Sequence, residues 1–116
     1  MNKTWSTDLG KVRVHKDVVR QIVLNTSQEI EGVLRIHYSL LDRFLKIFKP
    51  KSGIAIKVDI SQEDTVRIRV PVILKYGTDI KEVSLNMQEK ILKNLQETLG
   101  VLNFQIDIDV RGIERG

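Results

Sequence analysis

Residues 54–76 read IAIKVDISQEDTVRIRVPVILKY, and this stretch decides the fold. Apolar residues alternate with polar ones on both sides of the polar segment 61–64, and a period of two is typical of strands with one buried face. The stretch therefore predicts a long β-hairpin that turns at residues 61–64. Proline cannot donate a hydrogen bond to a neighbouring strand, so we expect Pro71 at a sheet edge or a bulge.

A helix and a closing strand are predicted after this hairpin. Asp79 and Glu82 have the spacing of a helix-capping box. Apolar residues then recur every three or four positions: Ile80, Val83, Met87, Ile91, Leu95 and Leu99. The pattern predicts a helix over residues 79–100 that ends at Gly100, and alternation over residues 104–110 predicts the last strand.

The residues before the hairpin predict a strand, a helix and a second strand. Alternation after Gly10 indicates a short strand over residues 12–14, and residues 33–38 indicate another. Between them, apolar residues and one threonine recur at helical spacing: Val18, Val19, Ile22, Val23, Thr26 and Ile30. Gly32 supplies the left-handed conformation at which helices often stop.

Residues 39–49 predict a short amphipathic helix. Ser39 can cap it, Pro50 prevents its continuation, and charged residues fill the side opposite the apolar one. The apolar side consists of Leu40, Leu41, Phe44, Leu45, Ile47 and Phe48. Three fates are open to it: packing on the domain's own core, contact with a protein partner or a second copy of the chain, or insertion into a membrane interface.

The predicted helix over residues 79–100 has a surplus of apolar surface as well. Leu85, Leu92 and Leu99, spaced by seven, widen its apolar arc beyond what one sheet covers. This surplus could meet the segment 39–49 of the same chain or a helix of a partner. The candidate interface residues are therefore Leu40, Leu41, Phe44, Leu45, Phe48, Leu85 and Leu92.

The predicted order of elements is strand, helix, strand, short helix, strand, strand, helix, strand. This order fits an α+β fold with a single layer of mixed or antiparallel β-sheet and two main helices on one face. A chain of 116 residues suffices for one hydrophobic core. We expect a single domain over residues 10–113, preceded by a flexible segment over residues 1–9.

Few residues have the spacing of a catalytic or metal site. The absence of cysteine excludes disulfides and thiolate chemistry. Asp107 and Asp109 share a strand face, as acid–base catalysis or a magnesium site would require, but basic residues on the same predicted face favour their neutralisation. His15 and His37 are predicted at the surface, and the glycines form no phosphate-binding motif. The sequence predicts no enzyme, and no catalytic, cofactor-binding or metal-binding residue.

The charge of the chain leaves a nucleic-acid alternative open. The net charge is +4, and the basic excess is densest over residues 35–57, which could attract phosphate or an anionic membrane surface. No aromatic residues are interleaved there to stack on bases, and no Gly-x-x-Gly loop occurs. A small basic RNA-binding protein is therefore the alternative function. Without an apolar run suited to a signal peptide or a membrane span, the expected location is the cytoplasm.

Short motifs along the chain resemble the bacterial alkaline shock protein family. They are Gly10-Lys-Val-Arg-Val, Val18-Val-Arg-Gln-Ile, Glu29-Ile-Glu-Gly-Val33, Leu74-Lys-Tyr-Gly77, Asp79-Ile-Lys-Glu-Val83, Met87-Gln88 and Ile106-Asp-Ile-Asp-Val-Arg-Gly112. The resemblance covers about residues 10–113. It implies a small cytoplasmic protein without enzymatic chemistry that is associated with envelope stress and alkaline tolerance. It also implies self-association and, in some members, recruitment to the membrane through a protein partner.

The sequence departs from that family pattern in its middle. Many relatives carry a glycine-rich connection where this chain carries the bulky segment 40–48. The prediction is a non-catalytic module that self-associates or binds a partner in envelope homeostasis, with the segment 40–48 as its contact element.

Overall fold

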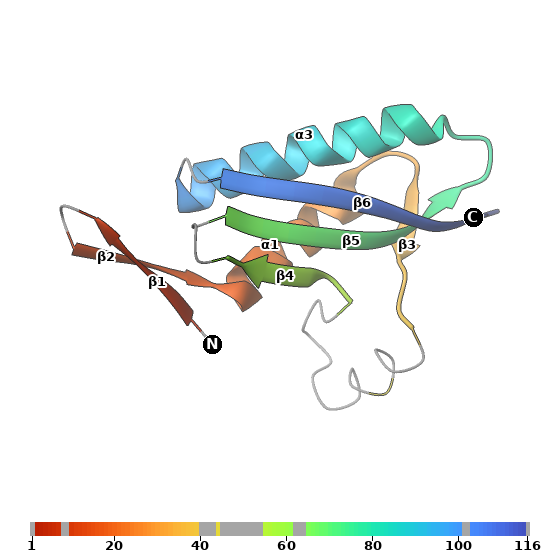
Figure 1. Cartoon of the computed structure of the whole chain (residues 1–116). Helices are drawn as coiled ribbons and strands as arrows, with labels where there is room; N and C mark the ends of the chain where they lie inside the picture. Colours follow the sequence, from red (N-terminus) through yellow and green to blue (C-terminus); the bar gives the residue numbers. More distant parts are fainter. Residues whose placement is uncertain are drawn as a thin grey trace.

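The computed structural model describes residues 2–7, 10–39, 44, 55–61, 65–100 and 103–115. These residues form an α+β fold in which two helices cover one face of a sheet (Figure 1), as the sequence predicts. The strands are β1 (Asn2–Thr7), β2 (Gly10–His15), β3 (Val33–Ile36), β4 (Lys57–Ile60), β5 (Thr65–Lys75) and β6 (Asn103–Glu114). The helices are α1 (Lys16–Glu29) and α3 (Ile80–Leu99).

Strand β5 is the centre of the main sheet. On one side it pairs in parallel with β6 from Thr65 to Lys75. On the other side its first half pairs antiparallel with β4, and its second half pairs antiparallel with β3. Strands β3 and β4 therefore share one edge of the sheet, while β6 forms the other edge alone within the described part of the chain.

Pro71 corrects one expectation, because it lies in the central strand rather than at an edge. Pairing with β3 reaches Val72 and pairing with β4 reaches Arg69, so Pro71 stands opposite the gap between these two strands. Its carbonyl oxygen accepts a hydrogen bond from the backbone N–H of His37 at 2.9 Å. The nitrogen of the same residue points to the same side of the strand, so the missing N–H falls where the ladder is already interrupted.

Strands β1 and β2 form a separate two-stranded antiparallel sheet, from Asn2 opposite His15 to Thr7 opposite Gly10. The predicted strand after Gly10 is present, but it pairs with β1 and not with the main sheet. Residues 2–7, expected in a flexible segment, are a strand. Figure 1 shows this hairpin beside the main sheet, leading into α1. The extent of the domain, residues 10–113, stays a prediction.

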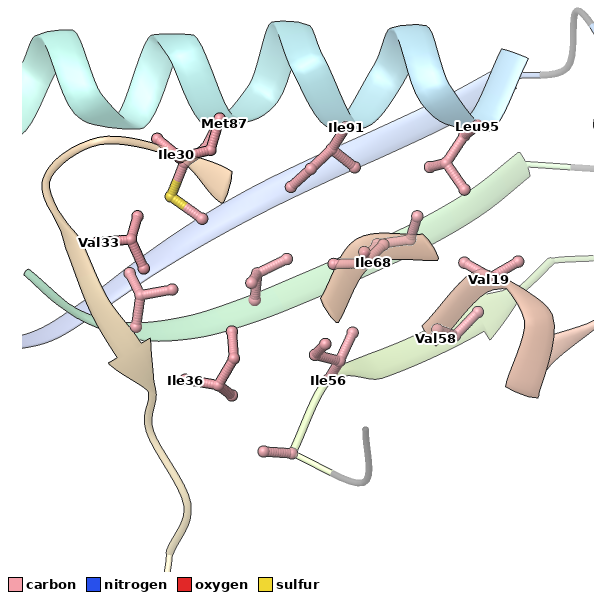
Figure 2. Close-up of a cluster of buried hydrophobic side chains, with 14 of the residues drawn as sticks. Val19, Ile30, Val33, Ile36, Ile56, Val58, Ile68, Met87, Ile91 and Leu95 are labelled. Atoms are coloured by element: carbon pink, nitrogen blue, oxygen red, sulfur yellow. The ribbon is translucent and has the colours of Figure 1, made fainter. Parts of the chain in front are cut away.

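The core lies between the main sheet and the two helices. The buried stripe of α3 consists of Val83, Met87, Ile91 and Leu95, and the last three of these have no exposed surface. Figure 2 shows Met87, Ile91 and Leu95 pointing from α3 toward the sheet, where Ile68 lies. The Asp79 carboxylate caps this helix by accepting a hydrogen bond from the backbone N–H of Glu82 at 3.1 Å.

Helix α1 packs beside α3 on the same face of the sheet. Val19 and Val23 are fully buried, whereas Val18, predicted on the same helix face, is 40% exposed. The side chain of Asn94 donates a hydrogen bond to the Thr26 hydroxyl at 2.8 Å, which in turn donates to the carbonyl oxygen of Ile22. A polar contact thus joins the two helices within an otherwise apolar interface.

Candidate contact surface

Three of the predicted interface residues lie in the described part of the chain. Phe44 is helical and 58% exposed. Leu85 is 48% exposed and Leu92 is half-buried. The other predicted interface residues, Leu40, Leu41, Leu45 and Phe48, lie outside the described residues.

The leucines of α3 lie on the side of the helix that is nearest to β6. Gln88, between Leu85 and Leu92 on this side, donates a hydrogen bond from its Nε2 to the carbonyl oxygen of Ile106 in β6 at 3.0 Å. At about 100° per residue, Leu85, Leu92 and Leu99 share the side of Gln88, displaced from the buried stripe. The helix therefore covers β6 while leaving leucine surface at the margin of the sheet.

Strand β6 contributes a row of half-buried apolar side chains to the same margin. The row consists of Phe104, Ile106, Ile108 and Val110. Their register partners in β5, which are Val66, Ile68, Val70 and Val72, are at most 1% exposed. The two rows differ because β5 has strands on both sides and β6 has one among the described residues. We define the α3–β6 flank as Leu85, Leu92, Leu99, Phe104, Ile106, Ile108 and Val110.

Further apolar surface continues from this flank toward the start of α3. Ile80 is 42% exposed, Ile113 is 44% exposed and Tyr76 is 67% exposed. The backbone N–H of Tyr76 donates to the carbonyl oxygen of Glu114 at 2.8 Å, which ties the end of β5 to the end of β6. Arg115 lies over the Tyr76 ring, 5.0 Å from its centroid.

The two aspartates of β6 have basic neighbours. Asp107 is exposed and lies opposite Arg69 of β5 in the register. Asp109 accepts a hydrogen bond from Arg111 at 3.5 Å. Within the described ranges, no three histidine, aspartate or glutamate side chains group closely enough to hold a metal ion. The aspartates thus belong to a surface of mixed charge on the open face of the sheet.

The histidines lie on different elements. His15 is exposed just before α1, and His37 is half-buried just after β3. The RNA-binding alternative stays a prediction, because none of these contacts tests it. No helix among the described residues is both long enough and apolar enough to cross a membrane.

A cleft of about 410 Å³ lies between α1 and β3. Its lining mixes apolar Leu24 and Leu34 with polar Gln28 and His37. The adjoining hollow of about 150 Å³ is lined in part by Ser27, whose buried hydroxyl has no hydrogen-bond partner in the described part of the chain. None of the described residues that line this cleft is a carboxylate, so they offer no acid–base pair comparable with the catalytic arrangements that a hydrolase needs.

The sequence pattern did not reveal the position of β6 at the sheet edge. Its alternation of apolar and charged residues is the same as that of the central strand β5. The one signal in the sequence was the surplus of leucine on the helix over residues 79–100, and the structure locates that surplus beside the edge.

Comparison with known proteins gives a family match over almost the whole chain. A family model of alkaline shock proteins, described as having a "cell envelope-related function", matches residues 4–115. No solved structure gives a significant match.

Three curated bacterial relatives cover the chain almost end to end. The chain is 26% identical over 114 residues to the uncharacterized protein Spy1614 of Streptococcus pyogenes serotype M6, covering 94% of this chain and 92% of that protein. It is 28% identical over 109 residues to the uncharacterized protein YqhY of Bacillus subtilis, covering 93% and 80%. It is 24% identical over 110 residues to the uncharacterized Bacillus subtilis protein YloU, covering 92% and 91%.

Proposed function

Because this chain belongs to the alkaline shock protein family, whose described function is related to the cell envelope, we propose that it is a non-catalytic contact module of envelope homeostasis. It acts by holding a second copy of itself or a protein partner, and it carries out no chemical conversion. The membership agrees with the resemblance that the short motifs of the sequence carry.

The observation that carries this proposal is the apolar surface along the α3–β6 flank. Leu85 is 48% exposed on a helix whose neighbouring stripe is buried, and the apolar row of β6 is only half-covered. Large contiguous apolar patches on a folded domain commonly mark sites of protein contact. Phe44, 58% exposed on a helical segment, adds a second exposed apolar residue.

The polar groups of the described residues support a contact role over a catalytic one. The nearest approach to a reactive cluster is the pair Asp107 and Asp109, and both have basic neighbours on the same surface. Catalysis by two carboxylates needs groups poised toward an enclosed substrate. This open face provides charge but no enclosure.

The proposal predicts that the exposed apolar residues are needed in the cell but not for folding. In a strain lacking the gene, we expect slower growth under alkaline or cell-wall stress, restored by the wild-type gene. Phe44→Ser and Leu85→Ser proteins should remain folded by circular dichroism, since both side chains are about half-exposed or more. They should fail to restore growth because their contacts are lost.

Lys93→Ser is the matched control, since Lys93 is exposed on α3 and carries no apolar surface. It should restore growth as the wild type does. The proposed function is wrong if the deletion strain tolerates envelope stress normally, or if the folded Phe44→Ser and Leu85→Ser proteins both restore growth fully.

A further inference from the structure

Strand β6 is a long sheet edge with little of the protection that such edges usually carry. It runs for 12 residues, and its only strand partner among the described residues is β5. The opposite edge of the sheet is divided between two strands of 4 residues each, β3 and β4. Natural sheets commonly protect edges with short strands, prolines, lysines or bulges. Strand β6 contains neither proline nor lysine, and its register shifts once, at Arg111.

The hydrogen-bonding groups on the outer side of β6 are largely open. Backbone groups of alternate residues point to each side of a strand, so β5 uses those on one side only. From outside β5, Gln88 binds the carbonyl oxygen of Ile106. No further bond of this kind reaches the described backbone from Ile108 to Ile113. This second half of β6 is therefore the accessible part of the edge.

We infer that a second copy of this chain pairs with β6, strand against strand and antiparallel, around a two-fold axis near Val110. This inference rests on the proposed function and specifies its partner and its surface. The two main sheets then form one continuous sheet, with the helices of both copies on the same face. Such closure around a two-fold axis uses the same patch on both copies.

Charge complementarity selects the second copy as the occupant. In an antiparallel pairing centred on Val110, Asp109 of each copy lies directly opposite Arg111 of the other. Asp109 and Arg111 already lie on the same face of β6, since their side chains meet at 3.5 Å. Opposite charges in directly opposed positions stabilise a strand pair, and like charges destabilise it. A pairing centred on Ile108 would instead set Asp107 against Asp109, so the charges also favour one register.

The apolar flank strengthens the same arrangement. Helix α3 runs antiparallel to β6, and Gln88 lies beside Ile106, so the first two turns of α3 lie alongside the second half of β6. These turns carry Ile80 and Leu85, which are 42% and 48% exposed. The two-fold axis brings the same turns of both copies toward each other. Pairing therefore buries apolar surface in addition to satisfying the backbone.

Charge-reversal variants test the pairing without disturbing the core. The wild-type chain should sediment as a dimer of about 26.8 kDa, twice the 13.4 kDa of one chain. Arg111→Asp places acidic residues opposite one another in its own dimer, and Asp109→Arg places basic residues opposite one another. Each variant alone should dimerise with a dissociation constant raised about tenfold or more, measured by sedimentation at low salt.

A mixture of the two variants gives the decisive measurement. When Arg111→Asp pairs with Asp109→Arg, every opposed pair is again of opposite sign, so the mixture should dimerise nearly as tightly as the wild type. Arg67→Asp is the control, because Arg67 is exposed on the same face but lies on the central strand β5. It should leave the dissociation constant unchanged. Circular dichroism should show all variants folded, since the changed side chains are at least one third exposed.

Several outcomes would overturn the inference. They are a wild-type chain that stays monomeric, an assembly larger than a dimer such as strand exchange through the β1–β2 hairpin would build, variants that dimerise like the wild type, or a mixture that does not recover. The growth assay with Leu85→Ser and Phe44→Ser is scored separately. A monomer whose folded apolar variants fail to restore growth would retain the proposed function and reject this pairing.

Discussion

Gly32 connects α1 to β3 in a conformation that other residues rarely adopt. Its φ is +97°, and a Cβ atom at this position would lie 2.7 Å from Cγ2 of Val83 in α3. The conformation explains why a glycine follows the first helix, as the sequence suggests. The close approach to α3 adds a second reason, which the local sequence does not contain.

Gly32→Ala should therefore destabilise the fold by about 2–4 kcal/mol, combining left-handed strain with overpacking against Val83. Gly77→Ala is the matched control, because Gly77 has a φ of +89° and no described atom within 4 Å of the added Cβ. It should cost about 1–2 kcal/mol from strain alone. Urea denaturation measures both values. Equal losses for the two variants would show that Val83 moves aside without cost.

Helix α3 divides into a side that holds the core and a side that lies at the sheet margin. Its buried stripe follows the helical spacing visible in the sequence, from Val83 to Leu95. The surplus leucines form part of the α3–β6 flank, and Leu85 is the most exposed of them. The same residue type thus has two roles on one helix, distinguished by what the sheet covers.

Leu95→Ala and Leu85→Ala should separate these roles. Leu95 is fully buried, so its truncation should lower the free energy of unfolding by about 2–5 kcal/mol through lost burial and a cavity. Leu85 is 48% exposed, and its truncation should cost about 1 kcal/mol or less. The two substitutions have the same helix propensity cost, so the difference reports packing. A loss at Leu85 as large as that at Leu95 would contradict the assignment of the flank as surface; both variants are measured in dilute solution.

At the scale of the whole molecule, the main sheet is organised around β5. This strand joins partners that are distant in sequence, since β6 pairs with it in parallel after the whole of α3 has intervened. Its apolar residues from Val66 to Leu74 are buried beneath the two helices. The β1–β2 sheet, by contrast, consists of two strands only among the residues that the structure describes.

Hydrogen exchange followed by mass spectrometry should reproduce this organisation. Amides of β5 should exchange most slowly, because the strand is paired on both sides and opens only when the core does. Amides of β1 and β2 should exchange fastest among the strands, since an isolated two-stranded sheet is marginally stable in water. Protection of β1 and β2 equal to that of β5 would show that the hairpin is held by contacts beyond its own pairing.

Local pattern was sufficient for the identity of most elements. The alternation over residues 65–75 and 103–114 and the helical spacing from Val83 to Leu95 arise from which face of each element is buried, and that periodicity is written in adjacent residues. The capping aspartate and the glycine after α1 were visible for the same reason. So was the apolar surplus on α3, which became part of the candidate surface.

Pairing between strands was decided only by the tertiary structure. A strand with one covered face has the same alternation whether it lies at the centre of a sheet or at its edge, so neither the central place of β5 nor the exposed edge of β6 could be read from the chain. Pro71 was misplaced on this account, because the gap between β3 and β4 exists only once both strands lie against β5. The sequence by itself determined the elements and their buried faces, through short-range periodicity. The order of the strands, and with it the surface left for a second molecule, depended on contacts between residues far apart in the chain.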